Sequence, residues 1–515
     1  MFNFRKELFK SGDNMRNYKL PHLAKNWISA IGAIIAIVFG VLVSVVLITN
    51  LVVGSSNQYL GILAYMVLPP FLVFGLLLIP FGMYLTWRRL KKTGEIPRQE
   101  WPSIDLNKGS HRRAAIIFGI GTTLFVILSI IGTYEGYHFT ESVTFCGRLC
   151  HTVMQPEYVT YQHSPHARVA CVSCHVGPGA GWYTKSKLSG AYQVYAVMAN
   201  VYPRPIPTPI KNLRPARVVC EQCHWPERFL GMQQQQFDHY RYDKDNSHWP
   251  ISMLLKTGGG DPDLRTIEGI HWHVSSGFEV QYIAGDEKRQ KIPWVKMTDK
   301  ATGEETIYQD TNEPLSEEEI KAAIPRVMDC VDCHNRPSHI FDSPDYAVDQ
   351  YITDGLISST IPDIKSVAVE AIAKEYNTSD TARTEIDSAL TSYYQDNYQE
   401  FYSANKALIA TAITKVQEIY ATNVFPVMKT RWSDYPNNIG HFYWPGCMRC
   451  HEGNHESSSG KVIPHECTTC HSILAQGEQA DVSISPEGLE FKHPVNIDGA
   501  WQVIGCYECH NGTQP

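Results

Sequence analysis

Three long apolar segments dominate the hydrophobic pattern of this chain. They cover residues 27–53, 60–86 and 114–133, and none contains Asp, Glu, Lys, Arg or His. A helix needs about 20 predominantly apolar residues to cross the ~30 Å hydrocarbon core of a bilayer. A buried helix of a water-soluble protein is usually shorter and keeps a polar face, which these segments lack. The pattern therefore predicts three transmembrane helices, the first of them an uncleaved anchor.

The distribution of Lys and Arg between these spans predicts their orientation. Residues 1–26 and 87–113 are rich in both, whereas the turn at 54–59 has neither. Loops with an excess of Lys and Arg stay on the cytoplasmic side. We therefore expect a cytoplasmic N-terminus and place everything from residue 134 onward outside the cytoplasm. The net charge of −7 provides no basic footprint for a nucleic acid.

A different periodicity appears beyond the spans. Phe278, Val280 and Tyr282 alternate with polar residues, and an apolar run at 292–297 precedes the turn sequence T-D-K-A-T-G. Alternation with period two and a turn containing Gly are typical of an antiparallel hairpin. We therefore expect a small antiparallel β insert within residues 231–325.

Helical periodicity returns in residues 343–425, where Ile409, Ile413, Val416 and Tyr420 recur at i, i+4, i+7 and i+11. An amphipathic pattern at 182–197 predicts a further helix, which would lie on the membrane surface.

These patterns divide the chain into ten segments. They are a tail at 1–26, spans at 27–53, 60–86 and 114–133 with a basic loop at 87–113, a first outer segment at 134–230, the β insert at 231–325, a short segment at 326–342, the helical block at 343–425 and a C-terminal segment at 426–515.

The cysteines add the chemistry. All fourteen fall into seven pairs, and a histidine follows every pair. In chain order we number them motif 1 to motif 7: Cys146/Cys150/His151, Cys171/Cys174/His175, Cys220/Cys223/His224, Cys330/Cys333/His334, Cys447/Cys450/His451, Cys467/Cys470/His471 and Cys506/Cys509/His510. Six are C-x-x-C-H, the attachment signature of c-type haem, and motif 1 has one extra residue between its cysteines.

Two other uses of paired cysteines fit less well. Structural zinc sites and redox-active or disulfide-bonded pairs place no demand on the residue after each pair. In a c-type haem the thiols bind the porphyrin and the histidine ligates the iron. The sequence therefore predicts seven haem c groups on the outer face of a bacterial inner membrane. The expected fold is three transmembrane helices followed by a haem-packed, mostly α-helical and irregular domain with the small antiparallel insert.

A second iron ligand is expected for most motifs. Of 21 histidines, seven belong to motifs, and His22 and His111 are expected in the cytoplasm. The remaining candidates lie near motifs or in the insert, whereas His163, His239 and His248 stay unassigned. The expected distal ligands are His166, His271, His273, His339, His441, His455, His465 and His493, with Met154 as the candidate for motif 1.

Residues 145–175, with F-C-G-R-L-C-H, a nearby Met and S-P-H-A-R-V-A-C-V-S-C-H, resemble the NapC/NirT/NrfH family of membrane-anchored quinol dehydrogenases. Stretches such as I-H-W-H-V and M-D-C-V-D-C-H-N-R-P-S-H extend the resemblance to the seven-haem, three-span ImcH type of inner-membrane cytochrome. The family resemblance implies that Met154 lies near the haem that meets quinol, that His166 ligates another haem and that Lys185 or Lys187 lines the quinol pocket. Residues 182–201 contain no Asp or Glu, so the family's acidic partner is either missing or replaced by Gln193.

The resulting hypothesis is quinol oxidation at the outer face, with electrons passing to periplasmic c-type cytochromes. Removing two protons from quinol requires a base, and the candidates are Lys185, Lys187, His138, Glu135 and Glu141. Two alternatives stay open: a passive relay subunit of a larger membrane complex, and a terminal reductase with an open-site haem. The expected partners are the quinol pool, soluble cytochromes and the bilayer, and a homo-oligomer is left open.

Overall fold

The computed structural model describes residues 23–53, 68–93, 105–177, 180–210, 214–225, 229, 231–258 and 269–513. The expected turn at 54–59, the first part of the second span and most of the N-terminal tail lie outside these residues. The chain divides into two compact units, Met1–Leu149 and Cys150–Pro515. Motif 1 straddles this division, because Cys146 belongs to the first unit and Cys150 to the second.

The first unit contains the three predicted membrane helices: α3 (Trp27–Val53), α5 (Leu68–Thr93) and α6 (Gly109–Glu141). Each is long and apolar enough to cross a membrane. α3 and α5 approach closely at two glycines, since a Cβ on Gly32 would lie 2.7 Å from the Gly75 carbonyl oxygen. The Ser29 hydroxyl also donates to the Ile79 carbonyl at 2.9 Å. In lipid, apolar helices associate where small residues let their backbones approach closely and where Ser or Thr side chains form hydrogen bonds between helices.

The third membrane helix is longer than its apolar segment. We expected the span to end at residue 133, but α6 continues through Tyr134 to Glu141. Ser142 ends it and at the same time caps α7 (Val143–Arg148), accepting a hydrogen bond from the Phe145 amide. Consequently Glu135, His138 and Glu141 lie on the final turns of a membrane helix rather than in a loop.

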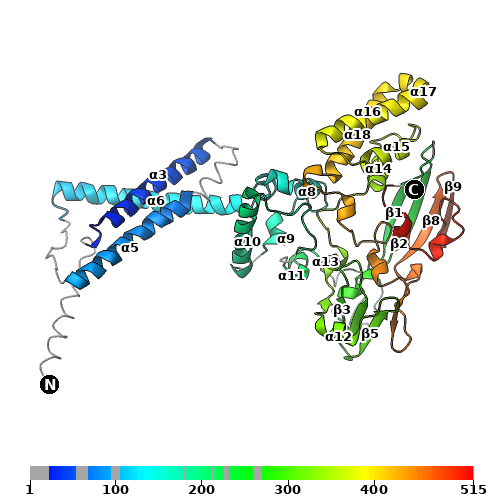
Figure 1. Cartoon of the computed structure of the whole chain (residues 1–515), viewed down its shortest axis with the longest axis horizontal. Coiled ribbons are helices and arrows are strands. Elements are labelled where there is room, and N and C mark those ends of the chain that lie inside the picture. Colours follow the sequence, from blue (N-terminus) through cyan, green and yellow to red (C-terminus); the bar gives the residue numbers. More distant parts are fainter. Residues whose placement is uncertain are drawn as a thin grey trace. The chain divides into compact units, whose positions relative to one another are not determined.

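The second unit begins with four helices, three of which include residues of motifs 1 to 3 (Figure 1). They are α8 (His151–Gln162), α9 (Cys171–His175), α10 (Ala180–Met198) and α11 (Ala216–Cys220). α10 confirms the helix predicted at 182–197. Further along are the short helices α12 (Glu317–Ala322), α13 (Cys330–Cys333) and α19 (Cys506–Cys509), and the 3-10 turns η4 (Ile270–Val274), η5 (Pro426–Met428), η6 (Trp432–Asp434), η7 (Gly446–Arg449), η8 (Cys467–Thr469) and η9 (Ala500–Gln502).

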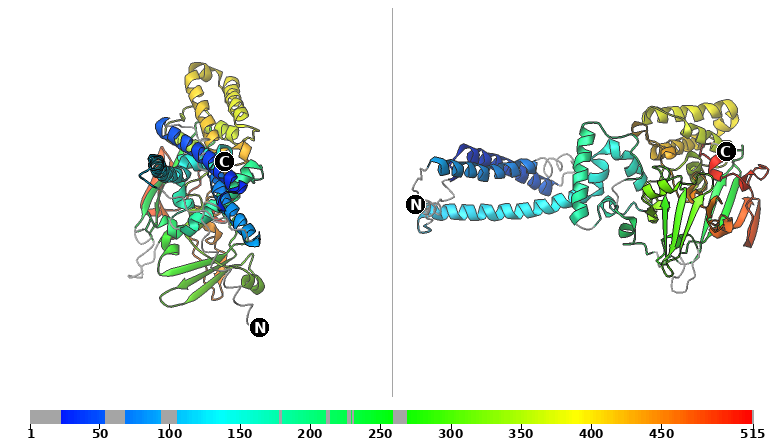
Figure 2. Two further views of the ribbon diagram at one scale, coloured as in Figure 1. Left: turned by 90° about the vertical axis from the view of Figure 1, so that its left-hand side faces the viewer. Right: turned by 60° about the horizontal axis from the view of Figure 1, so that its bottom comes forward.

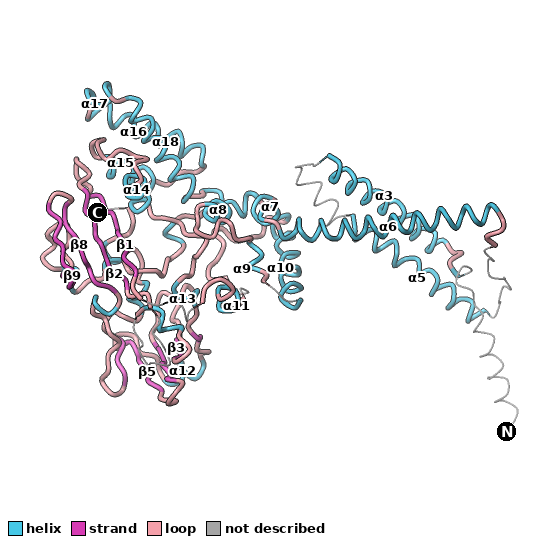
Figure 3. The backbone as a smooth tube through the Cα atoms, turned by 180° about the vertical axis from the view of Figure 1, so that it is seen from behind, coloured by secondary structure: helices cyan, strands magenta, loops and turns pink. Residues whose placement is uncertain are grey.

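The β structure consists of two antiparallel sheets (Figure 3). One has the order β1-β2-β8-β9 and the other β6-β3-β4-β5-β7. Their strands are β1 (Gln233–Tyr240), β2 (His248–Leu255), β3 (Phe278–Ile283), β4 (Trp294–Asp299), β5 (Glu305–Asp310), β6 (Arg326–Val327), β7 (His455–Ser457), β8 (His471–Glu478) and β9 (Asp481–Leu489).

The predicted hairpin is present as β4 and β5, and Val280 and Tyr282 of β3 are buried as their alternation indicated. The expected insert does not stand alone, however. β2 pairs with β8 and β5 pairs with β7, so both sheets take strands from the C-terminal segment. We expected no strands in that segment.

The helical block forms the largest apolar core. Its helices are α14 (Pro344–Thr353), α15 (Ile364–Ala373), α16 (Ser379–Asn397), α17 (Gln399–Ala404) and α18 (Lys406–Asn423). Figure 2 shows α16 and α18 side by side, and Ile386, Leu390, Ile409 and Val416 are almost fully buried between the helices. The predicted apolar stripe of α18 therefore packs into this core.

A buried ion pair lies at one end of this core. The Lys365 ammonium of α15 contacts the Asp349 carboxylate of α14 and donates to the Asp345 carbonyl oxygen at 2.8 Å. Both side chains are at most 3% exposed. A buried charge without its partner retains the full desolvation cost.

We therefore expect Lys365→Met to destabilise the helical block by about 3–5 kcal/mol. The double variant Lys365→Met/Asp349→Asn should regain most of this loss, because neither member of the pair then leaves its partner's charge uncompensated. As a control, Lys374→Met removes an exposed pair with Glu385 and should cost less than about 1 kcal/mol. Thermal unfolding followed by circular dichroism measures all three, and equal effects of the two single variants would contradict the expectation.

Candidate haem-attachment sites

Four of the six regular motifs share one local backbone geometry. In motifs 3, 4, 5 and 7 the amide of the histidine donates to the carbonyl of the first cysteine, at 2.8 to 3.1 Å. This closes a single helical turn around the two cysteines. The turn brings both thiols and the following imidazole into one small region, as attachment to one porphyrin requires.

The cysteines of these turns differ in exposure, although the prediction treats all fourteen alike. Cys223, Cys467 and Cys509 are exposed, whereas the others are partly buried. Cys223 still has the regular place in its turn, because its amide donates to the Cys220 carbonyl at 3.0 Å. Trp225, two residues further on, is 58% exposed as well, so described side chains do not close over this end of motif 3. Cys223 as an attachment residue therefore stays a prediction that rests on spacing and not on burial.

Every regular motif histidine faces a second imidazole. The ring centroids of these paired histidines lie 5.8–6.3 Å apart. The pairs are His175 with His339, His224 with His166, His334 with His271, His451 with His273, His471 with His441, and His510 with His493. An imidazole nitrogen lies about 2 Å from a metal that it ligates, so two rings on opposite sides of one ion have centres about 6 Å apart. The spacing fits one iron between each pair.

Hydrogen bonds orient the distal rings. The Nδ1 atoms of His166, His273, His339 and His493 lie 2.7–3.1 Å from backbone carbonyl oxygens, and that of His271 contacts the Thr257 carbonyl. A carbonyl can only accept, so the Nδ1 atoms of His166, His271, His273 and His339 carry the proton. Nε2 of these four rings is then left unprotonated for the metal, as is usual for metal-ligating histidines. These four residues fit haem iron in tautomer as well as in spacing. The Nδ1 of His493 also lies 3.2 Å from the Val495 amide, which donates to it, so these contacts do not fix the tautomer of His493.

The facing histidines come from distant segments of the chain. His339 follows motif 4 by five residues but faces His175 of motif 2. His271 and His273, two residues apart in η4, face the histidines of motifs 4 and 5. His441 precedes motif 5 yet faces His471 of motif 6. Each site is therefore built from parts of the chain that only tertiary structure brings together.

Neighbouring motifs also approach one another in chain order. The Cys220 and Cys330 thiols of motifs 3 and 4 are neighbours. At the remaining steps the thiols are close enough to influence one another electrostatically: Cys174 with Cys220 and Cys223, Cys333 with Cys447, Cys447 with Cys470, and Cys467 with Cys506. Motifs 2 to 7 thus form a continuous series.

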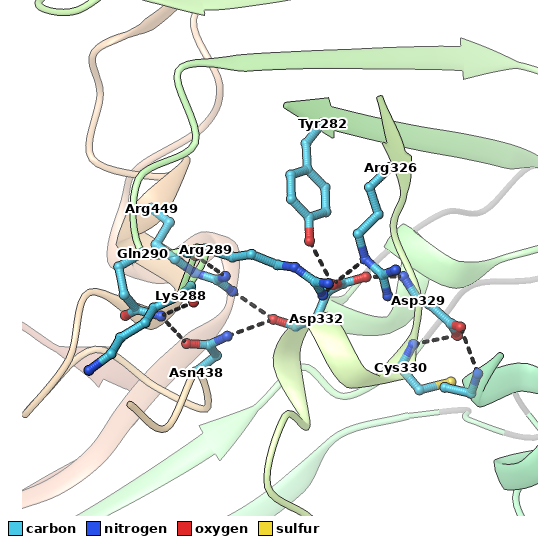
Figure 4. A network of polar contacts seen from close by, with 11 residues as sticks. Tyr282, Lys288, Arg289, Gln290, Arg326, Asp329, Cys330, Asp332, Asn438 and Arg449 are labelled. Atoms are coloured by element: carbon cyan, nitrogen blue, oxygen red, sulfur yellow. Dashed lines mark hydrogen bonds and ion pairs between the residues drawn. The ribbon is translucent and has the colours of Figure 1, made fainter. Parts of the chain in front are cut away.

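A polar network beside motif 4 was not foreseen from the sequence (Figure 4). The Asp332 carboxylate accepts from the Tyr282 hydroxyl at 2.6 Å, Arg326 at 2.8 Å and Arg289 at 3.1 Å. Burial raises the pKa of the Tyr282 hydroxyl most, and the neighbouring Asp332 carboxylate raises it further. The only sign of this network in the sequence is the acidic residue between the two cysteines of C-V-D-C-H. The network holds the motif 4 turn against β3 and β6.

Comparison with known proteins gives two matches. Residues 108–205 match the model of the NapC/NirT cytochrome c family, N-terminal region. Over 492 residues the chain is 45% identical to the cytochrome c-type protein ImcH of Geobacter sulfurreducens, covering 94% of this chain and 95% of that protein. The chain belongs to the ImcH-type multihaem cytochromes c of the NapC/NirT family. No solved structure matches it significantly. Electron transfer by a membrane-embedded c-type cytochrome follows from this membership.

Two predicted ligands of this cytochrome are placed elsewhere. His455 is 1% exposed and uses both ring nitrogens, Nδ1 on the Glu452 carboxylate at 2.6 Å and Nε2 on the Ile292 carbonyl at 2.7 Å. With acceptors on both sides the ring is a doubly protonated cation and has no lone pair for iron. His465 is exposed, and no described motif histidine faces it. Nearness to motif 5 or 6 in sequence was misleading for both.

The proposed base residues of the cytochrome lie on two helices. Glu135, His138 and Glu141 are on α6 of the first unit. Lys185 and Lys187 are on α10, with their ammonium groups 4.8 Å and 4.9 Å from the ring centroids of Trp182 and Tyr183. Met154 is half-buried, one turn after His151 on α8.

The paired histidines predict a spectroscopic result. Replacing His271 or His273 by Gln should each convert one low-spin haem to high spin, because one imidazole ligand is lost. His163→Gln, at an exposed histidine outside the pairs, is the control. Electron paramagnetic resonance of the purified cytochrome counts the high-spin centres, and an unchanged count in both variants would contradict the assignment.

His455 predicts a dependence of stability on pH. Burial lowers the pKa of His455, but the Glu452 carboxylate and the Ile292 carbonyl outweigh this, so its pKa lies above the ordinary value. The stabilisation is therefore complete below about pH 6.5, the unfolded pKa, and is lost as pH rises through the folded pKa. The difference in Tm between wild type and His455→Gln should shrink above neutral pH. A difference independent of pH would show that His455 is neutral.

Proposed function

We propose that this cytochrome oxidises quinol at the outer face of the bacterial inner membrane and delivers electrons, through motifs 1 to 7, to a soluble periplasmic c-type cytochrome. Haem c bound at each of the seven motifs supplies one-electron transfer. The observation that carries the proposal is the unbroken series of motifs 2 to 7, each with two facing histidines. It suits a conductor that begins near the membrane segment of the chain.

Motif 1 differs from the others in a way that suits a reacting site. Each of motifs 2 to 7 has a second histidine, whereas the candidate at motif 1 is Met154. A methionine ligand would raise the reduction potential of that haem relative to haems with two histidine ligands. The proposal therefore places the quinol reaction at motif 1.

The exposed apolar face of α10 supports membrane contact close to motif 2. Leu188, Tyr192, Tyr195 and Met198 recur at helical spacing and are 69%, 66%, 60% and 83% exposed. A row of aromatic and apolar side chains is typical of a helix in the membrane interface. Lys185 and Lys187 on the same helix then lie at the depth where a quinol head group is found.

Proton removal is assigned to the five candidate bases. Quinol loses two protons as it loses two electrons, so at least one acceptor must face it. His138 is a candidate because it lies in the last turn of α6, the third membrane helix. A terminal reductase receives less support, because facing histidines at motifs 2 to 7 leave no open position far from the membrane.

Reduction by quinol tests the proposal directly. In nanodiscs and without oxygen, a reduced menaquinol analogue should reduce the haem absorption bands of the cytochrome. Among Lys185→Gln, Lys187→Gln and His138→Gln, loss of the proton acceptor should slow this step by about 10²–10⁴-fold. Lys92→Gln, in the last turn of α5, is the control. Reduction by dithionite but not by quinol would favour the passive relay instead.

A further inference from the structure

Arg449 is a buried cation inside motif 5. It occupies the second variable position of C-M-R-C-H and is only 9% exposed. Its guanidinium donates to three carbonyl oxygens: Gly446 at 2.7 Å, Asp332 at 2.8 Å and Arg289 at 2.9 Å. Within the described part of the chain no carboxylate lies within 4 Å of it. Burying a charge is costly, and here only neutral carbonyl groups compensate for the lost water. This cost indicates a function of the charge at the neighbouring motifs.

The Asp332 carbonyl belongs to motif 4, so Arg449 connects two motifs. The same carbonyl also accepts from the Asn438 side chain at 3.0 Å (Figure 4). The Asn438 amide donates to the Asn335 side chain at 3.0 Å. Asn335 directly follows the motif 4 histidine. The turn of motif 4 is thus fastened to the segment that leads into motif 5.

The local charge is positive. Arg289, Arg326 and Arg449 surround this contact, opposed by the buried carboxylate of Asp332 and by Asp329. The charge of Arg449 also reaches the thiol of Cys333 in motif 4 and those of Cys447 and Cys450 in motif 5. A buried positive charge favours the reduced form of a nearby iron, which carries one positive charge fewer.

We propose that Arg449 is a positioning residue for electron transfer between motifs 4 and 5, and that its charge makes these two sites easier to reduce than they would otherwise be. The inference rests on the proposed function only for its direction of electron flow. The hydrogen bond to the Asp332 carbonyl fixes the position of motif 5 relative to motif 4. The positive charge of the guanidinium raises the reduction potential of the haem at each of these two motifs.

Redox titration of the full-length holoprotein, followed by optical and electron paramagnetic resonance spectra, is the test. Arg449→Met keeps the side-chain volume but removes the charge. At a fixed ambient redox potential, the ratio of reduced to oxidised haem at motifs 4 and 5 should fall by about tenfold. For a one-electron couple this corresponds to a reduction potential lower by about 59 mV. The other sites should not move. Arg383→Met, at an exposed arginine of α16 in the helical block, is the matched control and should change nothing.

Arg449→Lys separates placement from charge. Lysine keeps the charge but lacks the planar fork that bonds the Asp332 and Arg289 carbonyls together. We expect the two potentials to stay near wild type while the magnetic coupling between neighbouring ferric irons changes. If Arg449→Met fails to acquire all its haems, as mass spectrometry would show, Arg449→Lys still decides the placement.

Unchanged potentials in a fully loaded Arg449→Met protein would overturn the electrostatic role. Unchanged coupling in Arg449→Lys would overturn the positioning role. Both titrations use a chemical reductant, so they are independent of quinol. A cytochrome that quinol does not reduce but that shows the expected shifts would refute the proposed function and leave this inference standing.

Discussion

The facing of two imidazoles at each regular motif is the constraint that organises the outer part of this cytochrome. In every pair one ring follows a cysteine pair and the other comes from a separate loop, turn or strand end. Closing such loops has an entropic cost that a bond to metal offsets. Around motifs 4 to 6 the apolar clusters are small, such as Trp249, Ile251 and Ile473, so packing alone gives these segments little to hold them. The ligand pairs therefore determine much of the tertiary structure.

The helical block is stabilised by a different interaction. Its core of isoleucine, valine and tyrosine side chains contains no motif, and its stability comes from ordinary burial. It is nevertheless tied to the ligand-bearing segments. The Asp345 amide of α14 donates to the Gly512 carbonyl beside motif 7, and the Tyr443 hydroxyl contacts the Asp345 carboxylate. A rigid helical frame thus anchors loops that have few apolar contacts of their own.

The sequence was most informative where chemistry or periodicity is local. Cysteine spacing identified the attachment turns, although it could not distinguish the exposed Cys223 from its partly buried partner Cys220. Apolar length identified the three spans, and the stripe of α18 identified its buried face. These features depend on neighbours within a few residues, so the sequence alone contains them.

The sequence was least informative where partners are remote. His339 was predicted as a ligand, yet it faces His175 of motif 2 and not its neighbour in sequence, motif 4. His455 was misassigned because its acceptors, Glu452 and the Ile292 carbonyl, become visible only when β7 lies beside β5. β8 was missed because it begins at the motif 6 histidine, where a bulge near Ile473 interrupts the alternation.

The short turn η4 has a consequence for the sites at motifs 4 and 5. His271 and His273 stand on one turn of 3-10 helix, and each completes a different site. Any displacement of that turn moves both rings at once. The surroundings of motifs 4 and 5 are therefore coupled through five residues of backbone, and a change at one of them is transmitted to the other.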